Sequence, residues 1–277
     1  MVTVGVVSPG QMGAALGAVL RDGGVRVVAT LEGRSARTRG LASGLDLLPT
    51  LGDVVKVADI VLSVTPPAVA RENAGRIKEF AGRDTVIADL NAVSPATMAA
   101  VAADLAGHRL VDGSISGPPP TVANSARIYL AGKDAAVVAG LPWGDSVEAV
   151  VIGERIGSAS ALKMCTGSVY KGLTALLTQA MRTAGAFDVL DLVVQDLERN
   201  GLAHSKGVTR SAPKAHRFVA EMREVAATQA AAGLTPDLFT AIADVYADIA
   251  GTRLAEGAPE TAPDLDPAEI VARLRKP

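Results

Sequence analysis

Short apolar runs alternate with segments of helical period through the first half of the chain. Apolar runs bounded by turn residues are typical of strands buried on both faces of a parallel sheet. The segments between them have the spacing of amphipathic helices. The pattern predicts strands at residues 2–7, 25–30, 60–64, 85–89, 110–114 and 127–131, and helices at 11–21, 68–80 and 95–105.

The pattern changes near Gly157, where the β-branched runs largely stop and long segments rich in alanine and leucine begin. These segments predict helices at residues 158–184, 189–199, 213–232 and 236–255. Residues 255–267 contain three prolines, which favour an extended arm before a short terminal helix. The sequence therefore predicts an α/β domain over residues 1–156 and an all-α domain over residues 157–277.

Composition and charge exclude several classes of function. The chain has 27 basic and 29 acidic residues and only 3% aromatic residues, so it lacks the basic, aromatic-rich surface of nucleic-acid-binding proteins. No apolar run reaches the roughly 18 residues of a membrane span, and the first residues lack the basic region of a signal peptide. The single cysteine, Cys165, can form no internal disulfide and no metal cluster. We expect a cytoplasmic protein with no nucleic-acid partner, no membrane span and no bound metal.

Glycines mark the turn between the first predicted strand and the first predicted helix. In a dinucleotide-binding fingerprint, such glycines allow a tight turn and bring the pyrophosphate close to the N–H groups of a helix N-terminus. A serine replaces the first glycine here, and an ordinary strand–turn–helix is the alternative interpretation. The position of the turn favours a Rossmann-type domain with a nicotinamide cofactor. The residues expected to contact the cofactor here are Ser8, Gly10, Gln11, Met12 and Gly13.

The end of the second predicted strand carries residues that discriminate between NAD and NADP. Glu32 could accept a hydrogen bond from the ribose 2′-hydroxyl of NAD, whereas Arg34, Ser35 and Arg37 could hold the 2′-phosphate of NADP. The alternative is a solvated basic loop. The basic residues favour NADP, and NAD remains possible.

Two further turns follow predicted strands, and the carboxyl ends of strands are where open α/β sheets bind ligands. Thr65, Pro66 and Asn91 are expected to flank the nicotinamide and its ribose. After a later strand, the hydroxyl of Ser116 and the backbone at Gly117 suit the carboxylate or phosphate of a substrate. Each of these segments could equally be an ordinary turn with no role in ligand binding.

Lys163 lies near the start of the helix predicted from residue 158, at the expected join of the two domains. A desolvated lysine there could have a lowered pKa and exchange a proton with a substrate hydroxyl or carbonyl oxygen. The alternative is a surface lysine that extends its amine into solvent. Gly167, Tyr170 and Lys171 follow on the same helical face, and Tyr170 could contribute a hydroxyl to substrate binding.

Together these motifs resemble the beta-hydroxyacid dehydrogenase superfamily, which includes hydroxyisobutyrate and phosphogluconate dehydrogenases and, as a side branch, imine reductases. The segments that carry the resemblance are the turn at residues 10–13, the substrate signature at 112–117 and the catalytic-lysine signature at 157–163. Residues 214–222 resemble a C-terminal domain of poorly characterised, phosphogluconate-dehydrogenase-like oxidoreductases. The resemblance implies that Lys163 is the general acid or base, that Ser116 and Gly117 hold substrate, and that Asn91 approaches the nicotinamide ribose.

Two departures from the family pattern leave the substrate open. Gly167 stands where the family commonly has asparagine, and Pro118 replaces a usual glycine. The predicted function is an NADP-preferring oxidoreductase that transfers a hydride between nicotinamide and a small hydroxyacid or its carbonyl counterpart. An imine reductase and a non-catalytic dinucleotide sensor are the alternatives. The apolar helical half, and family members that pair through it, predict a homodimer in which residues 216–221 of one chain contribute to the partner's cleft.

Overall fold

The computed structural model describes residues 2–202, 205–259 and 263–275. The chain divides into two compact units, Met1–Met164 and Cys165–Pro277. One long helix, α7 (Ser158–Ala186), passes from the first unit into the second. The domain boundary expected after residue 156 lies just before this helix, and the compact units divide within it.

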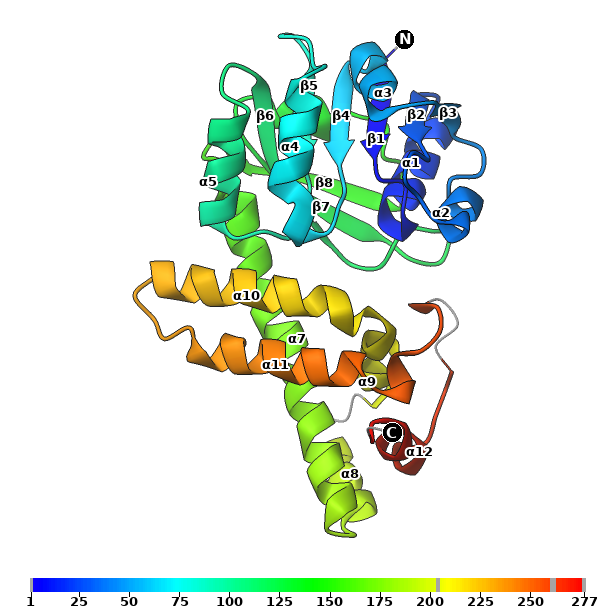
Figure 1. The fold of residues 1–277 in the computed structure, drawn as a ribbon, viewed down its shortest axis with the longest axis vertical. Coiled ribbons are helices and arrows are strands. Elements are labelled where there is room, and N and C mark those ends of the chain that lie inside the picture. The colour runs from blue at the N-terminus through cyan, green and yellow to red at the C-terminus, as the bar shows by residue number, and fades with distance from the viewer. Residues whose placement is uncertain (1, 203–204, 260–262, 276–277) are drawn as a thin grey trace. The chain divides into compact units, whose positions relative to one another are not determined.

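The described part of the first unit is built on an eight-stranded sheet in the order β3-β2-β1-β4-β5-β6-β7-β8. The strands β1 to β6 are parallel, β7 is antiparallel to β6, and β8 is parallel to β7. The strand order reverses between β1 and β4, and ligands bind outside the carboxyl ends of strands at such a reversal. The strands are β1 (Thr3–Val7), β2 (Arg26–Thr30), β3 (Asp46–Leu48), β4 (Ile60–Ser63), β5 (Val86–Asp89), β6 (Arg109–Ser116), β7 (Ala126–Ala131) and β8 (Val147–Gly153) (Figure 1).

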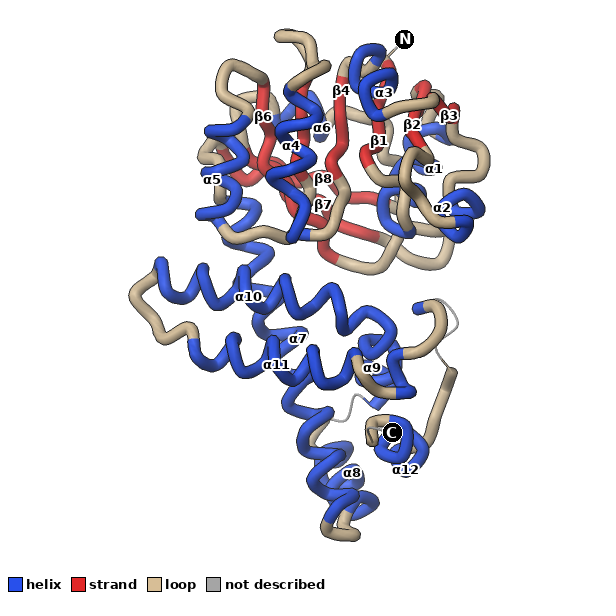
Figure 2. The backbone as a smooth tube through the Cα atoms, viewed as in Figure 1, coloured by secondary structure: helices blue, strands red, loops and turns tan. Residues whose placement is uncertain are grey.

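Helices cover both faces of this sheet (Figure 2). One hydrophobic cluster joins Val4 and Val6 of β1 to Leu16 and Leu20 of α1, and another joins Val7 to helices on the opposite face. Burial on both faces explains why the parallel strands are apolar throughout rather than alternating. The helices of this unit, besides the start of α7, are α1 (Gln11–Asp22), α2 (Ala36–Leu41), α3 (Leu51–Val57), η1 (Pro67–Val69), α4 (Ala70–Lys78), α5 (Pro95–Asp104) and α6 (Ala135–Ala139).

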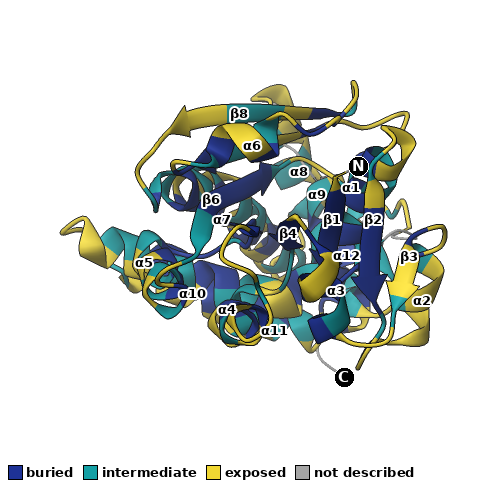
Figure 3. Ribbon diagram, turned by 90° about the horizontal axis from the view of Figure 1, so that it is seen from above, coloured by how far each residue is buried: buried dark blue, intermediate teal, exposed yellow. Residues whose placement is uncertain are grey.

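The predicted strands and helices of the first half are all present, but short and edge elements were missed. β3 has only three residues, and α2, α3 and α6 have seven or fewer, so none of them is long enough to show a period. β8 lies at the edge of the sheet and is largely exposed (Figure 3). Its run Ala149–Ile152 is as apolar as the runs of the central strands, so the sequence carried the signal for β8 although the strand was not predicted.

The regular elements that the structure describes in the second unit are all helical. After α7 come α8 (Leu190–Arg199), α9 (Ser205–Ser211), η2 (Ala212–Lys214), α10 (Ala215–Ala231), α11 (Asp237–Ala250), η3 (Arg253–Ala255) and α12 (Pro267–Arg273). α10 packs against α11, where the rings of Phe218 and Tyr246 meet edge to face with centroids 5.2 Å apart. The prediction of a Rossmann-type α/β domain followed by an all-α domain is confirmed.

Within the described ranges, no helix is long and apolar enough to cross a membrane.

Candidate dinucleotide and substrate site

The turn between β1 and α1 leaves a helix end open. Gly10 is the N-cap of α1, no side chain caps this end, and its first turn holds no acidic residue. A Cβ added at Gly10 would meet nothing within 4 Å, whereas a Cβ at Gly13 would lie 2.7 Å from the Ser8 carbonyl oxygen. Gly13 therefore allows the helix to approach the turn closely. Gln11 and Met12 begin the first helical turn, and Met12 also packs against the hydrophobic cluster that includes β1 and α1. The open end suits the pyrophosphate of a dinucleotide, since the helix dipole favours negative charge.

Ser8, which replaces the first glycine of the fingerprint, adopts a backbone conformation that glycine favours. Its φ is 66°, and the residue is buried. A residue with a Cβ adopts this region at a cost of about 1–2 kcal/mol. The backbone of this turn therefore has the geometry of a glycine turn with a serine in place of glycine.

The end of β2 places the predicted NADP residues on the surface. Arg34 and Arg37 are exposed, and Ser35 caps α2 by accepting a hydrogen bond from the Thr38 N–H at 3.4 Å. Glu32 is engaged within the protein: Leu51 N–H at the start of α3 donates to its Oε2 at 3.1 Å, and Arg76 lies 3.6 Å from the same oxygen.

Asn91 joins the ends of β4 and β5. Its Oδ1 accepts hydrogen bonds from the backbone N–H of Thr65 at 2.5 Å and from the Thr65 hydroxyl at 3.2 Å. Its Nδ2 donates to Ser63 Oγ at 3.1 Å and to Asp89 Oδ2 at 3.0 Å. Asn91 is 1% exposed, whereas Thr65 is half-buried and Pro66 is exposed. The structure thus brings Thr65 and Asn91 together, with Asn91 beneath the loop that Thr65 and Pro66 present.

Asp89 lies beneath Asn91 and was not singled out from the sequence. It is 2% exposed and accepts hydrogen bonds from the Asn91 backbone and side-chain nitrogens, both at 3.0 Å. Burial, reinforced by the charge of Asp112, raises the pKa of Asp89 from 3.8 to about 7 against the effect of these bonds.

Asp112 in β6 holds the start of α7. Its Oδ2 accepts hydrogen bonds from the backbone N–H groups of Gly157, Ala159 and Ser160 at 2.8, 2.9 and 3.3 Å. Its Oδ1 accepts one from the Ser160 hydroxyl at 2.7 Å. Burial raises the pKa of Asp112, and these bonds oppose the rise. The sequence signal that could have found both aspartates is an acid within, or directly ending, a buried strand.

Lys163 lies on α7 just after this anchored turn. Its Nζ donates a hydrogen bond to the carbonyl oxygen of Ile115 at 2.7 Å, and the side chain is half-buried. Ser116 follows as the last residue of β6, and Gly117 is exposed with a φ of 112°. A Cβ at Gly117 would lie 2.9 Å from the Ser125 carbonyl oxygen, so this bend needs glycine. The structure therefore brings the predicted lysine and the predicted substrate turn together within the first unit.

Tyr170 and Lys171, the other polar residues predicted on α7, belong to the second unit and differ in environment. The Tyr170 side chain is 68% exposed. Lys171 donates to Glu221 Oε1 at 2.5 Å, and its ammonium lies 4.9 Å from the centroid of the Phe218 ring. A Cβ at Gly167 would lie 3.8 Å from Glu221 Oε1 and 4.0 Å from Lys171 Nζ, so this ion pair borders the space left by the missing asparagine side chain.

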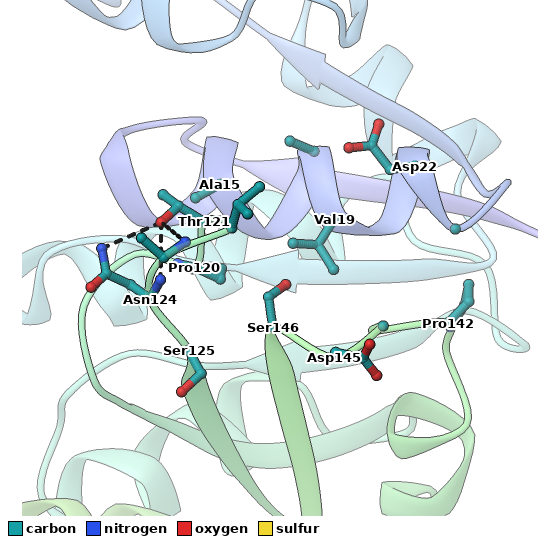
Figure 4. A pocket seen from close by; sticks show the side chains of 15 residues that line it. Ala15, Val19, Asp22, Pro120, Thr121, Asn124, Ser125, Pro142, Asp145 and Ser146 are labelled. Carbon is teal, nitrogen blue, oxygen red and sulfur yellow. Dashed lines mark hydrogen bonds between the residues drawn. The ribbon is translucent and has the colours of Figure 1, made fainter.

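A cavity of about 860 Å³ in the first unit is lined by other residues. It is bounded by the side of α1 and by the loops around Thr121 and Asp145 (Figure 4). None of the predicted site residues lines it.

Comparisons with known proteins agree with this geometry. Residues 3–149 match the model of the NAD binding domain of 6-phosphogluconate dehydrogenase, and residues 184–249 match a domain of unknown function (DUF1932). An uncharacterized 28.5 kDa protein of Methanothermus fervidus is 28% identical over 198 residues, which cover 70% of this chain and 76% of the relative.

Two solved structures extend the likeness over most of the chain. A conserved protein, described as structurally similar to 3-hydroxyacid dehydrogenases, is 30% identical with a TM-score of 0.64, covering 90% of this chain and 98% of its own. The 3-hydroxyisobutyrate dehydrogenase of Mycobacterium tuberculosis shares the fold at 18% identity, with a TM-score of 0.71 and 99% coverage of each chain.

The fold and the strand-end site define a Rossmann-type oxidoreductase that uses a nicotinamide dinucleotide. The chain belongs to the family described by the NAD binding domain of 6-phosphogluconate dehydrogenase. The predicted membership of the beta-hydroxyacid dehydrogenase superfamily, and with it the class of NAD(P)-dependent dehydrogenases and reductases, is confirmed.

Proposed function

We propose that this protein is an NADP-preferring oxidoreductase that acts on a small hydroxyacid or its carbonyl counterpart. The observation that carries the proposal is the position of Lys163, whose Nζ lies 2.7 Å from the Ile115 carbonyl oxygen. That contact places the amine beside Ser116 at the carboxyl end of β6, where ligands bind in this class of sheet.

In the proposed reaction, Lys163 exchanges one proton with the substrate oxygen. It gives the proton when a carbonyl is reduced and takes it when a hydroxyl is oxidised. The Ser116 hydroxyl and the Gly117 N–H hold the substrate's carboxylate or phosphate by hydrogen bonds. The nicotinamide, when bound, supplies or accepts the hydride.

Replacing Lys163 with methionine tests the catalytic assignment. Methionine is an unbranched side chain without the amine, and the expected cofactor contacts lie on other loops, so NADPH affinity should stay within about twofold. Turnover should fall by the roughly 10²–10⁴-fold that a positioned general acid or base contributes. Ser116→Ala should raise KM more than it lowers kcat, because it removes a contact made in both ground and transition states.

A Lys163→Met enzyme with near-normal turnover would refute the assignment. Tyr170→Phe and Lys171→Met, measured in parallel, would show whether another residue on α7 supplies the proton. Lys171→Met also needs a folding control, because it would leave the nearly buried Glu221 carboxylate without its partner.

The preference for NADP is supported by the environments at the end of β2. Glu32, the residue that argued for NAD, is engaged with Leu51 N–H and with Arg76. Arg34 in the same loop and Arg37 in the first turn of α2 are exposed. A charge-assisted hydrogen bond to the 2′-phosphate contributes about 1.5–3 kcal/mol, so one such contact suffices for tenfold selectivity.

Calorimetric titration measures this preference directly. NADPH should bind at least about tenfold tighter than NADH, and Arg34→Ala should narrow the difference by weakening NADPH binding alone. Equal or reversed affinities would remove the preference while leaving the proton-transfer role of Lys163 untouched.

Two other functions on this fold are separated by a substrate panel. An imine reductase needs no lysine to protonate an alkoxide, so Lys163 favours the hydroxyacid reaction over imine reduction. A non-catalytic sensor would bind NADPH and turn over nothing. Assays with hydroxyacids, oxoacids and cyclic imines, each with NADP⁺ or NADPH, distinguish the three functions.

A homodimer formed through the second unit is also proposed. Val169, Leu173 and Leu176 on α7 are 56, 49 and 58% exposed, and spacings of three and four residues place them on one helical face. Leu173 and Leu176 also line a cavity of about 910 Å³ bounded by α7, α8 and α9. A second copy would remove this apolar surface from water.

Light scattering at micromolar concentration should give twice the mass of one chain for the unmodified protein. The Leu176→Glu variant should give the mass of a single chain. The mass of a single chain for the unmodified protein would contradict the dimer.

Within the dimer, the exposed His216 could reach a partner's cleft, whereas Glu221 is already bound to Lys171 of its own chain.

We also propose a reducing, cytoplasmic location, which the single, exposed Cys165 supports.

A further inference from the structure

Two buried aspartates stand side by side at the carboxyl end of the sheet. Asp89 of β5 and Asp112 of β6 are paired in the register of these parallel strands. They are 2% and 0% exposed. Paired residues of neighbouring strands point to the same face of a sheet, so the two buried carboxyl groups lie on the same face. Burying carboxylates in this way is costly unless hydrogen bonds satisfy them.

The carboxylate of Asp89 binds Asn91. It accepts from the backbone N–H and from the Nδ2 of Asn91, both at 3.0 Å. With Nδ2 directed to the carboxylate, the Oδ1 of Asn91 faces the opposite way and accepts from the N–H of Thr65. Asp89 therefore determines which end of the Asn91 amide meets the Thr65 loop.

The carboxylate of Asp112 binds the start of α7. Three backbone N–H groups and the Ser160 hydroxyl donate to its two oxygens. Three residues further along each element, Lys163 Nζ donates to the Ile115 carbonyl oxygen at 2.7 Å. β6 and α7 are therefore joined by hydrogen bonds at two successive points, and the Lys163 amine makes the second of them.

We propose that Asp89 and Asp112 are positioning residues with separate tasks: Asp89 orients the cofactor-facing Thr65 loop through Asn91, and Asp112 orients Lys163 through the first turn of α7. The proposal rests on the proposed function, because it assigns the cofactor to the Thr65 loop and the proton to Lys163. The two tasks are separable because no residue takes part in both chains of hydrogen bonds described above.

Asp89→Asn and Asp112→Asn test this separation in the full-length protein. Each keeps the shape of the side chain and removes its charge and one strong acceptor. NADPH affinity is measured by fluorescence titration. The ionisation of Lys163 is followed by NMR in protein with ¹³C at lysine Cε, where the Lys163 signal is identified by its absence from Lys163→Met.

Asp89→Asn should weaken NADPH binding about tenfold and leave the Lys163 titration midpoint in place. Asp112→Asn should leave NADPH affinity within about twofold, move the Lys163 midpoint by at least about 0.5 pH units, and lower kcat more than it raises KM. Both variants remove a charge from neighbouring strands, so a purely electrostatic influence on Lys163 would appear in both.

Asp53→Asn is the matched control, since Asp53 anchors a different helix, α3, through the capping box with Thr50. It should lower stability without moving either readout. If Asp112→Asn does not fold, Ser160→Ala removes one of the same bonds and should shift the Lys163 midpoint in a smaller, measurable step.

An Asp112 or Ser160 variant that leaves the Lys163 midpoint unchanged would overturn the proposal, as would two aspartate variants that change both readouts alike. Neither readout requires turnover. If Lys163→Met kept full activity, the catalytic assignment would fail, whereas the two positioning roles would still be decided by affinity and titration.

Discussion

The N-termini of α1 and α7 lie in the same compact unit and have opposite environments. α1 begins at Gly10 with no side-chain cap, and a Cβ there would meet no atom within 4 Å. The start of α7 is closed by the carboxylate of Asp112, which accepts three backbone N–H bonds and one hydroxyl bond. Every helix N-terminus attracts negative charge. One end leaves this attraction available for a ligand, whereas the other satisfies it permanently with a buried acid.

The contrast separates binding from positioning. With glycine as its N-cap, α1 forfeits only a few tenths of a kcal/mol relative to an aspartate or asparagine cap, and its open end suits an anion. A capped end gives up that site and becomes a rigid base for the side chains that follow, here Lys163. In the proposed site, the same physical interaction would hold the ligand at one helix and holds the protein's own carboxylate at the other.

The largest expected effect is in pH dependence, because Asp112, which closes the start of α7, and its strand neighbour Asp89 are buried acids, whereas the first turn of α1 holds no acidic residue. The pKa of Asp89 is about 7 in the folded protein, against 3.8 ordinarily. Folding therefore takes up a proton between these values, and the free energy of unfolding should fall as pH rises from about 4 to about 7. The fall amounts to roughly 4 kcal/mol, from about three pKa units at 1.36 kcal/mol each. The raised pKa of Asp112 acts in the same direction.

Chemical denaturation of the unmodified protein and of Asp89→Asn at several pH values between 4 and 8 measures this effect. The variant should lack most of the decline that Asp89 causes. Parallel curves for the two proteins would show that Asp89 titrates normally.

Closing the open end should convert α1 into a helix like α7. In Gly10→Asp, the new carboxylate can accept from N–H groups of the first turn, because the φ of −69° and ψ of −169° at this position suit an acidic N-cap. Stability without cofactor should rise by a few tenths of a kcal/mol or more. NADPH affinity should fall at least about 100-fold, because the carboxylate occupies the anion site and repels the pyrophosphate.

Gly10→Asn is the control for Gly10→Asp, since asparagine caps equally well without the charge. It should lose less affinity than the aspartate. Tight NADPH binding by Gly10→Asp would show that the pyrophosphate does not lie at this helix end.

The smallest effect should come from relaxing the turn before α1. The φ of 66° at Ser8 costs a residue with a Cβ about 1–2 kcal/mol, and glycine loses about 0.5–1 kcal/mol more in chain entropy. Ser8→Gly should therefore stabilise the protein by roughly 0.5 kcal/mol, measured as a rise in the midpoint of urea denaturation. A loss of stability would mean that the serine side chain makes a compensating contact.

The candidate site could be predicted in its outline but not in its supports. The turn at Gly10 and Gly13, the loop at Thr65 and the lysine at 163 were found because each follows a recognisable strand or opens a helix. Asp89 and Asp112 were not predicted as functional residues, although Asp112 opens the segment that resembles the substrate signature. An acid at a strand end has no local signature for what it binds, and the partners of Asp112 are 45 to 48 residues away in the chain.

Glu32 illustrates a residue whose type fitted one role and whose surroundings supply another. The sequence offered it as a ribose ligand, whereas the structure engages its carboxylate with the N-terminus of α3, 19 residues later. Nothing near Glu32 in the sequence indicates that contact.

The sequence by itself determined the succession of buried strands and amphipathic helices, the change to an all-helical second half, and the glycine turn, because hydrophobic period and backbone freedom are local properties. Only the tertiary structure decided which helix ends are open and which are filled, and that the buried acids Asp89 and Asp112 bind Asn91 and the start of α7. Those outcomes depend on strand register and on hydrogen bonds between residues far apart in the chain, and a carboxylate's burial and pKa are set by neighbours that folding alone brings together.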